Sequence, residues 1–479
     1  MIDNNELRHT PMADSVFKEY DIRGKVGEEL SLDEMYDLVC SIAYYFIHNN
    51  PSTKTVAVGM DGRIHSPHIK KQVCKALCDS GLNVWFLGLC PSPALYFAMH
   101  TLPVEAGIMI TASHNPKEYN GLKICLGKHL VYGPAIKEIG RLFKEQKKVE
   151  ETDCGKLSEY PIIEPYINWL ADHFTDLKGM KLSVIIDCGN AVAGTVFPQL
   201  IKKMHWPNVQ LLYEEIDGTY PHHTADPVIE KNMLDVKKVL AGTDIAFGIG
   251  FDGDGDRMAA MTKEGYLLPG DRLLALFAKS ILKDNPGAAV VFDIKASSGL
   301  IDLLQQWGAE QVMTKTGHAF IKKAMQEHNA LLGGELSCHF FFNDRYFGFD
   351  DGIYAALRLF ELLVKSGKSL DELLTIFPQR YSSPEIRITC PPEKMGMIID
   401  QLKSTFSQRN DTELITIDGV RAVMPYGWGI VRVSNTQPML SMRFESDSSY
   451  GLKQVKNDFL TILRQYFDED LLQREIMEQ

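Results

Sequence analysis

Apolar runs rich in β-branched residues alternate with amphipathic stretches along the first three quarters of the chain. Three segments, which begin at Lys54, Lys181 and Ala288, repeat one order of features: an apolar run that ends near an Asp, a short polar loop, an amphipathic stretch and a second short apolar run. The order strand, loop, helix, strand is the βαβ unit of a mostly parallel sheet. Because these units are far apart in the sequence, they predict three α/β domains instead of one large sheet.

The first of these units carries the clearest helix signals. Ser66 is expected as the N-cap, Pro67 at the first helical position, and Gly81 just after the last turn. Between them, Ile69 and Leu77 fall on one helical face. This spacing predicts a helix that packs on the sheet through that face.

The last hundred residues have a different pattern. The run 385–389 predicts a strand, residues 393–407 a helix, and the stretch 429–444 two strands around a polar turn. Apolar residues from Leu452 to Tyr466 predict a closing helix. Strands bracketed by two helices are typical of an α+β domain.

The length of the chain, 479 residues, is too great for a single core. Pro, Gly and Ser collect near 151–161, 261–270 and 377–385, where we expect hinges. We therefore predict α/β domains over residues 1–158, 159–264 and 265–378, followed by an α+β domain over residues 379–479.

Composition narrows the class of protein. The hydrophobic content of 45% and the charged content of 23% are those of an ordinary soluble globular protein. A formal net charge of -12 argues against a nucleic-acid partner, which needs clustered Lys and Arg. No apolar stretch approaches the roughly 18 residues of a membrane span. An anionic small molecule, bound at a locally basic site, is compatible with all of this.

The pattern of the nine cysteines indicates in which cellular compartment the protein is found. Their number is odd, and they form no CxxC pair and no Cys/His metal spacing. Reduced thiols in a reducing compartment explain this usage. The start of the chain is neither basic nor apolar, so we expect no signal peptide and a cytoplasmic location.

The most specific polar cluster is FDGDGDR, residues 251–257, after the apolar run DIAFGIG. Asp252, Asp254 and Asp256 alternate with glycine, so an extended backbone would point the three carboxylates to one side. At roughly 4 Å and an effective dielectric constant of about 20, each pair would repel by about 4 kcal/mol. A divalent cation relieves that repulsion, and three oxygen ligands favour Mg²⁺. The alternative is a solvated acidic turn.

Two other interpretations of this stretch are rejected. An EF-hand needs Gly at the sixth and Glu at the twelfth position, which hold Arg257 and Lys263 here. The sequence GIGFDG at 248–253 matches the dinucleotide fingerprint GxGxxG, which must open a helix that receives a pyrophosphate. The aspartates that follow would repel phosphate and start no helix.

A second cluster, TASHNP, follows the apolar run AGIMI and contains Ser113 and His114. A serine hydroxyl is a weak nucleophile unless a base or a positive field assists it. On its own, this loop fits a capping turn as well as a nucleophile.

The third and fourth clusters could recognise a sugar phosphate. In GGELSCHFF, Glu335, Ser337 and His339 alternate and could hold vicinal sugar hydroxyls, although a half-exposed strand edge has the same pattern. In RVSNT, one guanidinium, two hydroxyls, a carboxamide and turn N–H groups make a phosphate cradle, or else a polar hairpin turn. The residues of this cradle are Arg432, Ser434, Asn435 and Thr436.

These four clusters, in this order, resemble the α-D-phosphohexomutases, and most closely the bacterial phosphomannomutase/phosphoglucomutase branch. The resemblance extends from EYDIRG at Glu19 to the terminal helix, and DGDGDR and TASHNP are specific in combination. GELSCH is similar to the GEMSGH of that branch, with Leu336 in place of Met and Cys338 in place of Gly. VRVSNTQP resembles the SNT phosphate loop of the branch and not the SGTEP loop of phosphoglucosamine mutases.

The resemblance implies an architecture, a reaction and a set of partners. The expected fold has three α/β domains with mixed, mostly parallel sheets and a C-terminal α+β domain around a central cleft. The expected reaction is reversible phosphoryl transfer between the 1- and 6-positions of mannose and glucose phosphates, through a phosphoserine and a hexose 1,6-bisphosphate that also activates the enzyme. The resemblance implies a monomer that binds hexose 1-phosphates and 6-phosphates, and neither a nucleic acid nor a membrane.

The resemblance also implies roles for particular residues. Ser113 would carry the phosphoryl group and, with Asp252, Asp254 and Asp256, bind Mg²⁺. Lys123 would act as general acid/base, a role that requires a lowered pKa if it is to accept a proton near neutral pH. The remaining expected catalytic residues are His114, Arg23, Arg257 and His339. The expected substrate contacts are Tyr20, Lys295, His318, Glu335, Ser337, Arg432, Ser434, Asn435 and Thr436.

Other functions stay open at this stage. They are a phosphoglucosamine mutase of the same superfamily, a Mg²⁺-dependent sugar-phosphate phosphatase with Asp252 as nucleophile, and a sugar-phosphate sensor without catalysis.

Overall fold

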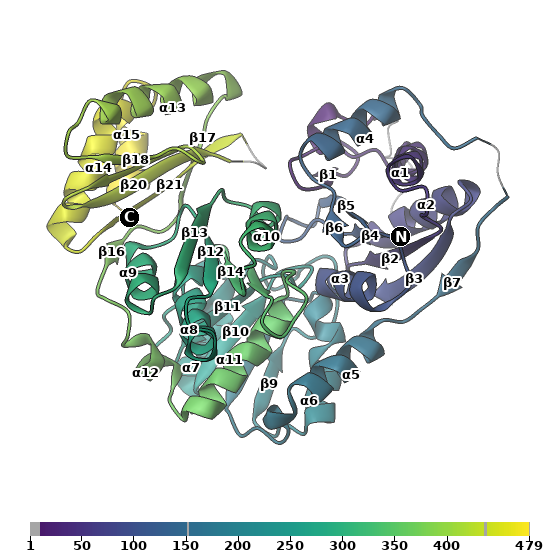
Figure 1. Ribbon diagram of the computed structural model, residues 1–479, viewed down its shortest axis with the longest axis horizontal. Helices are drawn as coiled ribbons and strands as arrows, with labels where there is room; N and C mark the ends of the chain where they lie inside the picture. Colours follow the sequence, from purple (N-terminus) through teal and green to yellow (C-terminus); the bar gives the residue numbers. More distant parts are fainter. Residues whose placement is uncertain (1–9, 151–152, 435–437, 479) are drawn as a thin grey trace. The chain divides into compact units, whose positions relative to one another are not determined.

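The computed structural model describes residues 10–150, 153–434 and 438–478 (Figure 1). They form two compact units. The first comprises the chain up to Gly270 together with Ser337–Leu373, and the second comprises Asp271–Leu336 together with the chain from Leu374 onward. The three expected domain boundaries stay predictions.

The first unit opens with a mixed seven-stranded sheet in the order β1-β5-β4-β2-β3-β7, with β6 added beside β5. Strands β2 and β3 pair in parallel, as the first βαβ segment predicts, and β2 also pairs in parallel with β4. Strand β5 is antiparallel to both β1 and β4. The strands are β1 (Ile22–Lys25), β2 (Thr55–Met60), β3 (Asn83–Leu89), β4 (Ala106–Ile110), β5 (Tyr119–Leu126), β6 (His129–Leu130) and β7 (Leu157–Glu159).

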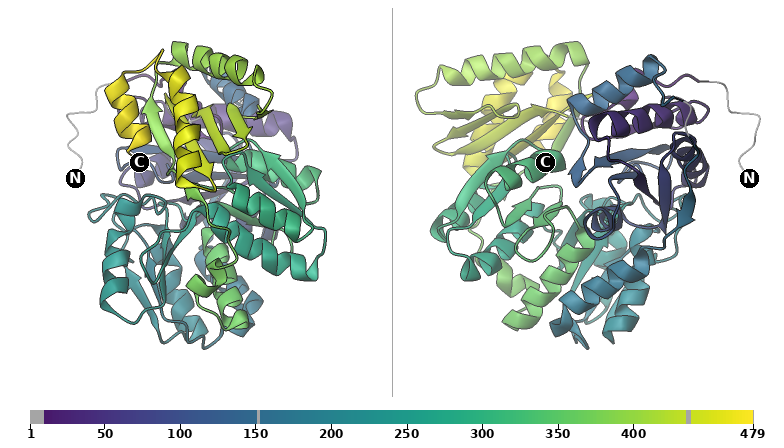
Figure 2. Two further views of the ribbon diagram at one scale, coloured as in Figure 1. Left: turned by 90° about the vertical axis from the view of Figure 1, so that its left-hand side faces the viewer. Right: turned by 45° about the vertical axis from the view of Figure 1, so that its right-hand side comes forward.

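Helices cover both faces of this sheet. Helices α1, α2 and α4 lie on one face, side by side in Figure 1 and in the right-hand view of Figure 2, and α3 lies on the other. Their apolar faces bury Phe46, Leu77 and Ile139 completely. The elements are α1 (Met35–Asn49), α2 (Ser66–Asp79), α3 (Ser92–Thr101), α4 (Pro134–Lys144) and the short 3₁₀ turn Asp14–Val16.

The expected cap of α2 is wrong by one residue. The helix already includes Ser66, its N-cap is His65, and no side chain caps it. The Ser66 hydroxyl is taken by Asp61, to whose Oδ1 it donates a hydrogen bond of 2.8 Å. The expected end of the helix is confirmed, because Gly81 follows it with a positive φ of 83°.

The second sheet of this unit has the order β11-β10-β8-β9. Strand β8 pairs in parallel with β9 and β10, whereas β10 and β11 form an antiparallel hairpin. Strand β10 therefore leads into a tight turn and not into a helix, which confirms that GIGFDG is no dinucleotide fingerprint. The elements are β8 (Val184–Asp187), β9 (Val209–Leu212), β10 (Phe247–Phe251), β11 (Met258–Thr262), α5 (Ile163–His173), α6 (Phe197–Met204) and α7 (Leu234–Gly242), with 3₁₀ turns at Thr175–Leu177, Val192–Thr195 and Glu230–Met233.

The returning segment Ser337–Leu373 completes the first unit with β15 (Phe340–Phe342), the buried helix α11 (Gly352–Ser366) and most of α12 (Leu370–Leu374). Asp351 caps α11, because its Oδ1 accepts the Tyr354 N–H at 2.8 Å. Its Oδ2 accepts the hydroxyls of Tyr166 and Tyr346, both at 2.7 Å. The cap therefore ties α5 to the returning segment.

This cap makes stability depend on pH. Burial raises the pKa of Asp351 to about 6, above its ordinary value of 3.8. Between these values the folded state holds a proton that the unfolded state has lost, so the contribution of Asp351 is full below pH 4 and is lost as pH rises through 6, by up to about 3 kcal/mol. We expect Asp351→Asn, which keeps a capping oxygen, to gain stability relative to the unaltered protein over this window. Urea unfolding at several pH values between 4 and 7.5 measures the difference, and a constant difference would contradict the assignment.

The second unit begins with a parallel α/β layer in the strand order β13-β12-β14. Strand β12 pairs in parallel with β13 and with β14, as the third βαβ segment predicts. Ser297 caps α9 by accepting the Gly299 N–H at 3.0 Å. The elements are α8 (Gly270–Asp284), β12 (Ala289–Asp293), α9 (Ser298–Gln306), β13 (Glu310–Thr314), α10 (His318–Glu327) and β14 (Leu332–Gly334).

The C-terminal part of the second unit is the expected α+β domain. Its antiparallel sheet has the order β16-β21-β20-β19-β18, with β17 beside β21, and α13 and α14 share one apolar core with it (Figure 1). The predicted strands and helices are confirmed, but β18 and β19 were not predicted. The elements are β16 (Tyr381–Ser382), β17 (Ile386–Thr389), α13 (Pro392–Ser407), β18 (Glu413–Ile415), β19 (Val420–Met424), β20 (Gly427–Val433), β21 (Met439–Ser446), α14 (Ser449–Leu463), α15 (Glu469–Leu472) and the π turn Gln473–Met477.

The opposite face of this sheet packs on the α/β layer of the same unit. Trp428 and Ile430 contact Ile294, and the buried Arg421 donates hydrogen bonds to the carbonyl oxygens of Ile294 and Ala296. The second unit is therefore one body with two sheets. Among the helices of the described ranges, none has both the length and the apolar content that crossing a bilayer requires.

Candidate active site

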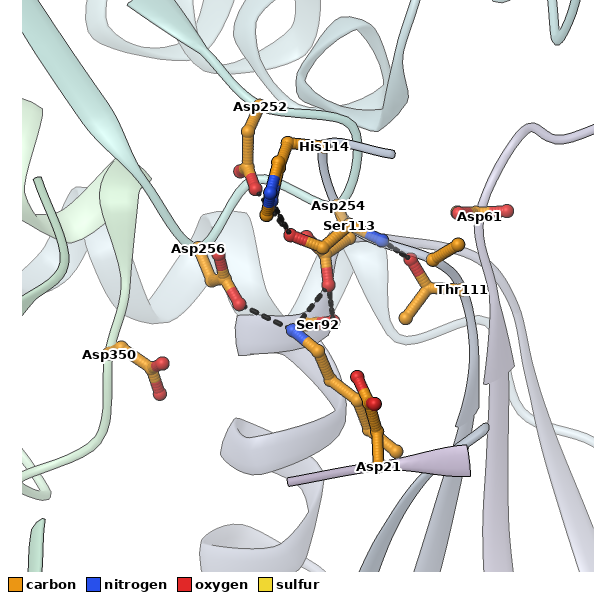
Figure 3. Close-up of polar contacts among 12 residues, drawn as sticks. Asp21, Asp61, Ser92, Thr111, Ser113, His114, Asp252, Asp254, Asp256 and Asp350 are labelled. Atoms are coloured by element: carbon orange, nitrogen blue, oxygen red, sulfur yellow. Dashed lines mark hydrogen bonds and ion pairs between the residues drawn. The ribbon is translucent and has the colours of Figure 1, made fainter. Parts of the chain in front are cut away.

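Ser113 lies in the loop that follows β4, at the carboxyl end of the first sheet. Its side chain is buried, and its φ of 51° places a non-glycine residue in the left-handed region. The hydroxyl donates a hydrogen bond of 2.9 Å to Asp252 Oδ2 and lies 3.1 Å from Nδ1 of His114 (Figure 3). The Ser113 N–H is held by the hydroxyl of Thr111 at 2.9 Å.

Asp252, Asp254 and Asp256 lie in the turn between β10 and β11. All three are completely buried, and ligand oxygens of the three lie within 4.8 Å of one another (Figure 3). The expected convergence is confirmed, but its expected cause, an extended backbone, is wrong. Residues 253–255 form a turn in which Gly255 has a φ of 73°.

Lys123, from β5, enters this cluster of carboxylates. Its Nζ donates to Asp254 Oδ2 at 2.6 Å and also to Asp256 Oδ2. Asp254 is further held by the hydroxyl and N–H of Ser92 at the start of α3. The Oδ1 atoms of Asp254 and Asp256 are buried without a hydrogen-bond partner in the described part of the chain. Unpaired carboxylate oxygens that converge in this way form a site that could hold a metal ion.

The electrostatics follow from burial and from Lys123. Burial, and then the charges of Asp256 and Asp254, raise the pKa of Asp252 well above its usual value. For Asp256 burial acts in the same direction, but the charge of Lys123 holds its pKa below the usual value. Asp254 and Asp256 in turn raise the pKa of Lys123 against the effect of burial. The lowered pKa expected for a Lys123 base is therefore not found while the lysine bridges two carboxylates.

A second series of polar contacts links the turn between β10 and β11 to the returning segment Ser337–Leu373. Arg257 Nε donates to His339 Nε2 at 2.9 Å, so this nitrogen is an acceptor and the ring carries its proton on Nδ1. His339 Nδ1 lies 3.2 Å from Asp350 Oδ2 and 3.6 Å from Asp256 Oδ1. Arg257 and His339, both predicted, are thus brought next to the triad, and Asp350 was not predicted.

Arg23, on β1, also contacts the Ser113 loop. Its Nε donates to Asp21 Oδ2 at 2.9 Å, and its Nη1 donates to Asn115 Oδ1 at 2.9 Å. Tyr20 is buried just before β1, and Ser337 begins the returning segment. The first unit therefore assembles every predicted catalytic residue and two of the predicted substrate contacts.

The other predicted contacts belong to the second unit. Lys295 Nζ donates to Glu385 Oε1 at 2.9 Å and lies 3.7 Å from Asp293 Oδ2. Glu335 Oε1 accepts the Gly317 N–H at 2.6 Å, directly before His318 at the start of α10. Lys295, Glu335 and His318 are all buried.

Arg432, on β20, is linked through Asp418 to Thr316, in the loop that precedes α10. Arg432 Nε donates to Asp418 Oδ2 at 2.8 Å, and this oxygen also accepts the Thr316 N–H at 3.1 Å. Nη2 of Arg432 is buried with no hydrogen-bond partner among the described residues. The Ser434 N–H donates to the Met439 carbonyl at 2.9 Å. The predicted residues Asn435 and Thr436 lie outside the described residues.

One predicted arrangement is wrong. Glu335, Ser337 and His339 do not alternate along an extended strand, because residues 336–338 turn and Cys338 has a φ of 67°. The turn also separates the units, since Glu335 belongs to the second and Ser337 to the first.

Several residues of the site were missed. They are Ser92, Asp350 and Asp418, and above all Asp61 and Arg63 under the Ser113 loop. The signal for Asp61 and Arg63 was present, because GMDGR places charges at the end of an apolar strand as FDGDGDR does.

Comparison with known sequences identifies the family. Profiles described as phosphoglucomutase/phosphomannomutase α/β/α domains I, II and III and C-terminal domain match residues 14–150, 164–265, 269–381 and 385–462. The chain belongs to the phosphoglucomutase/phosphomannomutase family. This assignment confirms the predicted fold class of three α/β domains and a C-terminal domain, and the predicted class of enzyme, an isomerase of hexose phosphates.

Individual relatives agree over nearly the whole chain. A phosphomannomutase/phosphoglucomutase of Pseudomonas aeruginosa is 39% identical over 454 residues, which cover 94% of this chain and 96% of the relative. A phosphoglucomutase of Neisseria meningitidis is 39% identical over 453 residues, with 94% and 97% covered. The crystal structure of a phosphoglucomutase/phosphomannomutase family protein from Burkholderia thailandensis matches with a TM-score of 0.87 at 34% identity, and covers 95% of this chain and 98% of its own.

Proposed function

We propose that the protein interconverts the 1-phosphates and 6-phosphates of glucose and mannose through a phosphoryl group carried by Ser113. The observation that carries this proposal is the hydrogen bond of 2.9 Å from the Ser113 hydroxyl to Asp252, which places a buried serine beside three buried carboxylates. The loop is held through the backbone of Ser113, by Thr111 and Arg63, and the hydroxyl is a separate group at its end. It is well placed to hold a phosphoryl group next to a cation.

The cation that we propose is Mg²⁺, bound by Asp252, Asp254, Asp256 and an oxygen on Ser113. The donor set consists of oxygens alone, which Mg²⁺ prefers, and two of these oxygens have no partner in the described chain. When bound, Mg²⁺ supplies a positive charge that draws electron density from a phosphoryl group under transfer.

In the forward step, the bond between phosphorus and the Ser113 oxygen breaks while a bond forms to the free hydroxyl of a hexose 1- or 6-phosphate. The hydroxyl proton leaves to a base of the site, and the Ser113 oxygen regains a proton. In the second step the bond between the sugar oxygen and the original phosphate of the substrate, now a hexose 1,6-bisphosphate, breaks while a bond forms to the Ser113 oxygen, whose proton passes to the oxygen left on the sugar. A trace of this bisphosphate would recharge protein that has lost its phosphoryl group.

The neighbouring side chains have matching proposed roles. Arg257 and Arg23 present guanidinium groups to the oxygens of the transferring group. His339 is fixed with Nε2 as an acceptor by Arg257, and Lys123, which is protonated between two carboxylates, first supplies positive charge and a proton. His114 shares a contact with the Ser113 hydroxyl and orients it.

The second unit would bind the part of the substrate that does not react. We propose that Arg432, Ser434, Asn435 and Thr436 bind the remote phosphate, and that Tyr20, Lys295, His318, Glu335 and Ser337 contact the sugar. The buried, unpartnered Nη2 of Arg432 supports this, because a buried guanidinium N–H needs an acceptor and a phosphate oxygen provides one.

We expect Arg432→Ala to raise KM roughly 30-fold, because it removes two charge-assisted hydrogen bonds to a phosphate that does not react, and to lower kcat far less. Steady-state kinetics with glucose 1-phosphate measures both constants. Arg409→Ala is a control, since Arg409 is also in the C-terminal domain but pairs with Asp411 and Asp458. An unchanged KM for Arg432→Ala would contradict the phosphate contact.

The remaining proposals concern the oligomeric state, the partners, the cellular location and the domain boundaries. We propose a monomer, because one chain supplies all the groups named above, with neither nucleic acid nor membrane as a partner. We also propose a cytoplasmic location, which is supported by nine free cysteines. The domain boundaries 158/159, 264/265 and 378/379 are proposed as well.

The decisive experiment is a direct mutase assay. Purified protein, Mg²⁺ and a trace of glucose 1,6-bisphosphate are incubated with glucose 1-phosphate, mannose 1-phosphate or glucosamine 1-phosphate, and the 6-phosphates are measured. Formation of glucose 6-phosphate and mannose 6-phosphate supports the proposal, whereas turnover of glucosamine 1-phosphate alone would favour a phosphoglucosamine mutase. Release of inorganic phosphate, with a phosphoprotein that mild alkaline hydroxylamine cleaves, would indicate a phosphatase with an aspartyl nucleophile.

A further inference from the structure

Arg63, in the loop after β2, donates hydrogen bonds to backbone carbonyl oxygens along the whole Ser113 loop. Its side chain is completely shielded from solvent. Nη2 donates to the carbonyl oxygens of Ser113 at 2.6 Å and Asn115 at 2.7 Å, and Nη1 donates to those of Pro116 at 2.8 Å and Tyr119 at 3.0 Å. One guanidinium therefore satisfies four backbone acceptors within seven residues of chain.

Asp61 fixes this guanidinium in place. Arg63 Nε donates to Asp61 Oδ2 at 3.1 Å, and the Arg63 N–H donates to Asp61 Oδ1, also at 3.1 Å. The Ser66 hydroxyl donates to the same Oδ1 at 2.8 Å. With Nε and its backbone both anchored, the planar end of Arg63 has a fixed direction, and all five of its N–H groups are used.

The loop needs such a support because of its backbone. Ser113 has a φ of 51°, a conformation that costs a non-glycine residue roughly 1–2 kcal/mol and persists only where the surroundings impose it. Thr111 holds the N–H of Ser113 and Arg63 holds its carbonyl, so the peptide units on both sides of its α-carbon are fixed. The direction of the side chain from that α-carbon is thereby fixed as well, and it leads to Asp252.

We infer that Arg63 is a positioning residue for the phosphoryl-carrying serine, an inference that rests on the proposed function. Arg63 touches the loop backbone and not the hydroxyl, so it acts on the reaction through Ser113 alone. It keeps the Ser113 oxygen at the three carboxylates both before and after the loss of the phosphoryl group. Lysine cannot replace it, because three donors on one nitrogen cannot reach four carbonyl oxygens spread along the loop.

The test compares Arg63→Lys and Arg63→Ala with the unaltered protein. Because a displacement of about 1 Å in a reacting group costs on the order of 100-fold in rate, we expect kcat to fall about 100-fold in both variants, with KM changed less than about threefold. Millimolar guanidinium should restore part of the activity of Arg63→Ala, whereas methylammonium, with its compact charge, should not. Loss of kcat without guanidinium rescue, or a kcat within threefold of the unaltered protein, would overturn the inference.

Hydrogen exchange supplies a readout that does not depend on activity. In Arg63→Lys, amides of residues 113–119 should exchange at least about tenfold faster, while those of β8 in the second sheet stay unchanged. Arg358→Lys is the matched control, since Arg358 is also a buried arginine of the first unit and pairs with Asp344 in two hydrogen bonds of 2.7 and 2.8 Å. Unchanged exchange in the loop would refute the inference even if kcat fell.

The two proposals fail in different ways. If the proposed function is wrong, the unaltered protein has no mutase activity and no phosphoryl group on Ser113, although Arg63→Lys still loosens the loop. If only the inference on Arg63 is wrong, the unaltered protein is active and phosphorylated, and Arg63→Lys keeps its kcat and its slow exchange. If Arg63→Ala does not fold, Arg63→Lys decides, because it keeps the buried charge opposite Asp61.

Discussion

Replacement of Ser113 by alanine is expected to lower turnover by about four orders of magnitude or more while leaving the fold intact. The hydroxyl is the atom that would carry the phosphoryl group, so no neighbouring side chain can take over its role. Its structural contribution is small by comparison. It donates one hydrogen bond, to Asp252, whereas the loop is held through the backbone of Ser113 by Thr111 and Arg63. The free energy of unfolding should therefore fall by no more than about 3 kcal/mol, the usual cost of losing a hydrogen bond to a buried carboxylate.

The measurement combines a mutase assay, thermal unfolding and incorporation of radioactive phosphate from glucose 1,6-bisphosphate. Ser113→Ala should incorporate none. Ser41→Ala is the control, because Ser41 is also a buried serine of the first unit, but its hydroxyl donates to the Lys147 carbonyl at 2.9 Å. Turnover within tenfold of the unaltered protein in Ser113→Ala would exclude Ser113 as the carrier.

Much of the fold could be predicted, because its signals are local. A βαβ unit is encoded within about 35 consecutive residues, and all three predicted units are present as β2–α2–β3, β8–α6–β9 and β12–α9–β13. The C-terminal strands β18 and β19 were missed. Strand β18 has three residues and pairs with β19, and β19 pairs with β20, which lies after both in the sequence, so their own residues do not mark them as part of a sheet.

Among the site residues, too, those with a local signal in the sequence could be predicted, and those that depend on contacts between distant segments could not. Asp252, Asp254 and Asp256 could be predicted because they are neighbours in the sequence, and any compact turn brings them together. Lys123 and Ser92 reach them from more than 100 residues away, and only the packing of the first sheet against the β10–β11 turn places them there. A spacing pattern in the sequence cannot show a contact of that kind.

Two predictions failed because they assumed a backbone conformation. The triad was expected on an extended chain, and so were Glu335, Ser337 and His339. In both places a residue with positive φ, Gly255 or Cys338, turns the chain instead. A glycine at such a position gives a warning in the sequence, but a cysteine gives none, because side chains rarely adopt that conformation.

The direction of the pKa shift of Lys123 was predicted wrongly, because the sequence does not show which charged groups surround the lysine. A general base at this position would need a lowered pKa, but the groups within hydrogen-bond distance of Lys123 are two carboxylates, which raise its pKa. The lysine therefore stands as a counter-charge to the triad. Any cation that binds Asp254 and Asp256 has to share them with Lys123 or displace it.

Removal of the metal is expected to have the second large effect. A chelator should lower turnover at least about 1,000-fold, and Mg²⁺ should restore it, because electrostatic stabilisation is often the largest single contribution to such a transfer. Binding to the folded state alone should also stabilise the protein, by about 2.7 kcal/mol when Mg²⁺ is at 100 times its Kd. Thermal unfolding over a series of Mg²⁺ concentrations measures this apart from activity.

Asp252→Asn separates binding of the metal from stability of the fold. In the metal-free protein Asp252 is buried beside two other carboxylates, and burial together with these charges raises its pKa. Asparagine removes one charge but keeps an oxygen to accept the Ser113 hydroxyl or the Arg257 N–H. We therefore expect the metal-free variant to be more stable than the unaltered protein by about 1 kcal/mol, yet to lose both its activity and its stabilisation by Mg²⁺. A variant that is stabilised by Mg²⁺ as strongly as the unaltered protein would show that the cation binds elsewhere, and one that is less stable without metal would show that the carboxylates do not repel one another in the folded state.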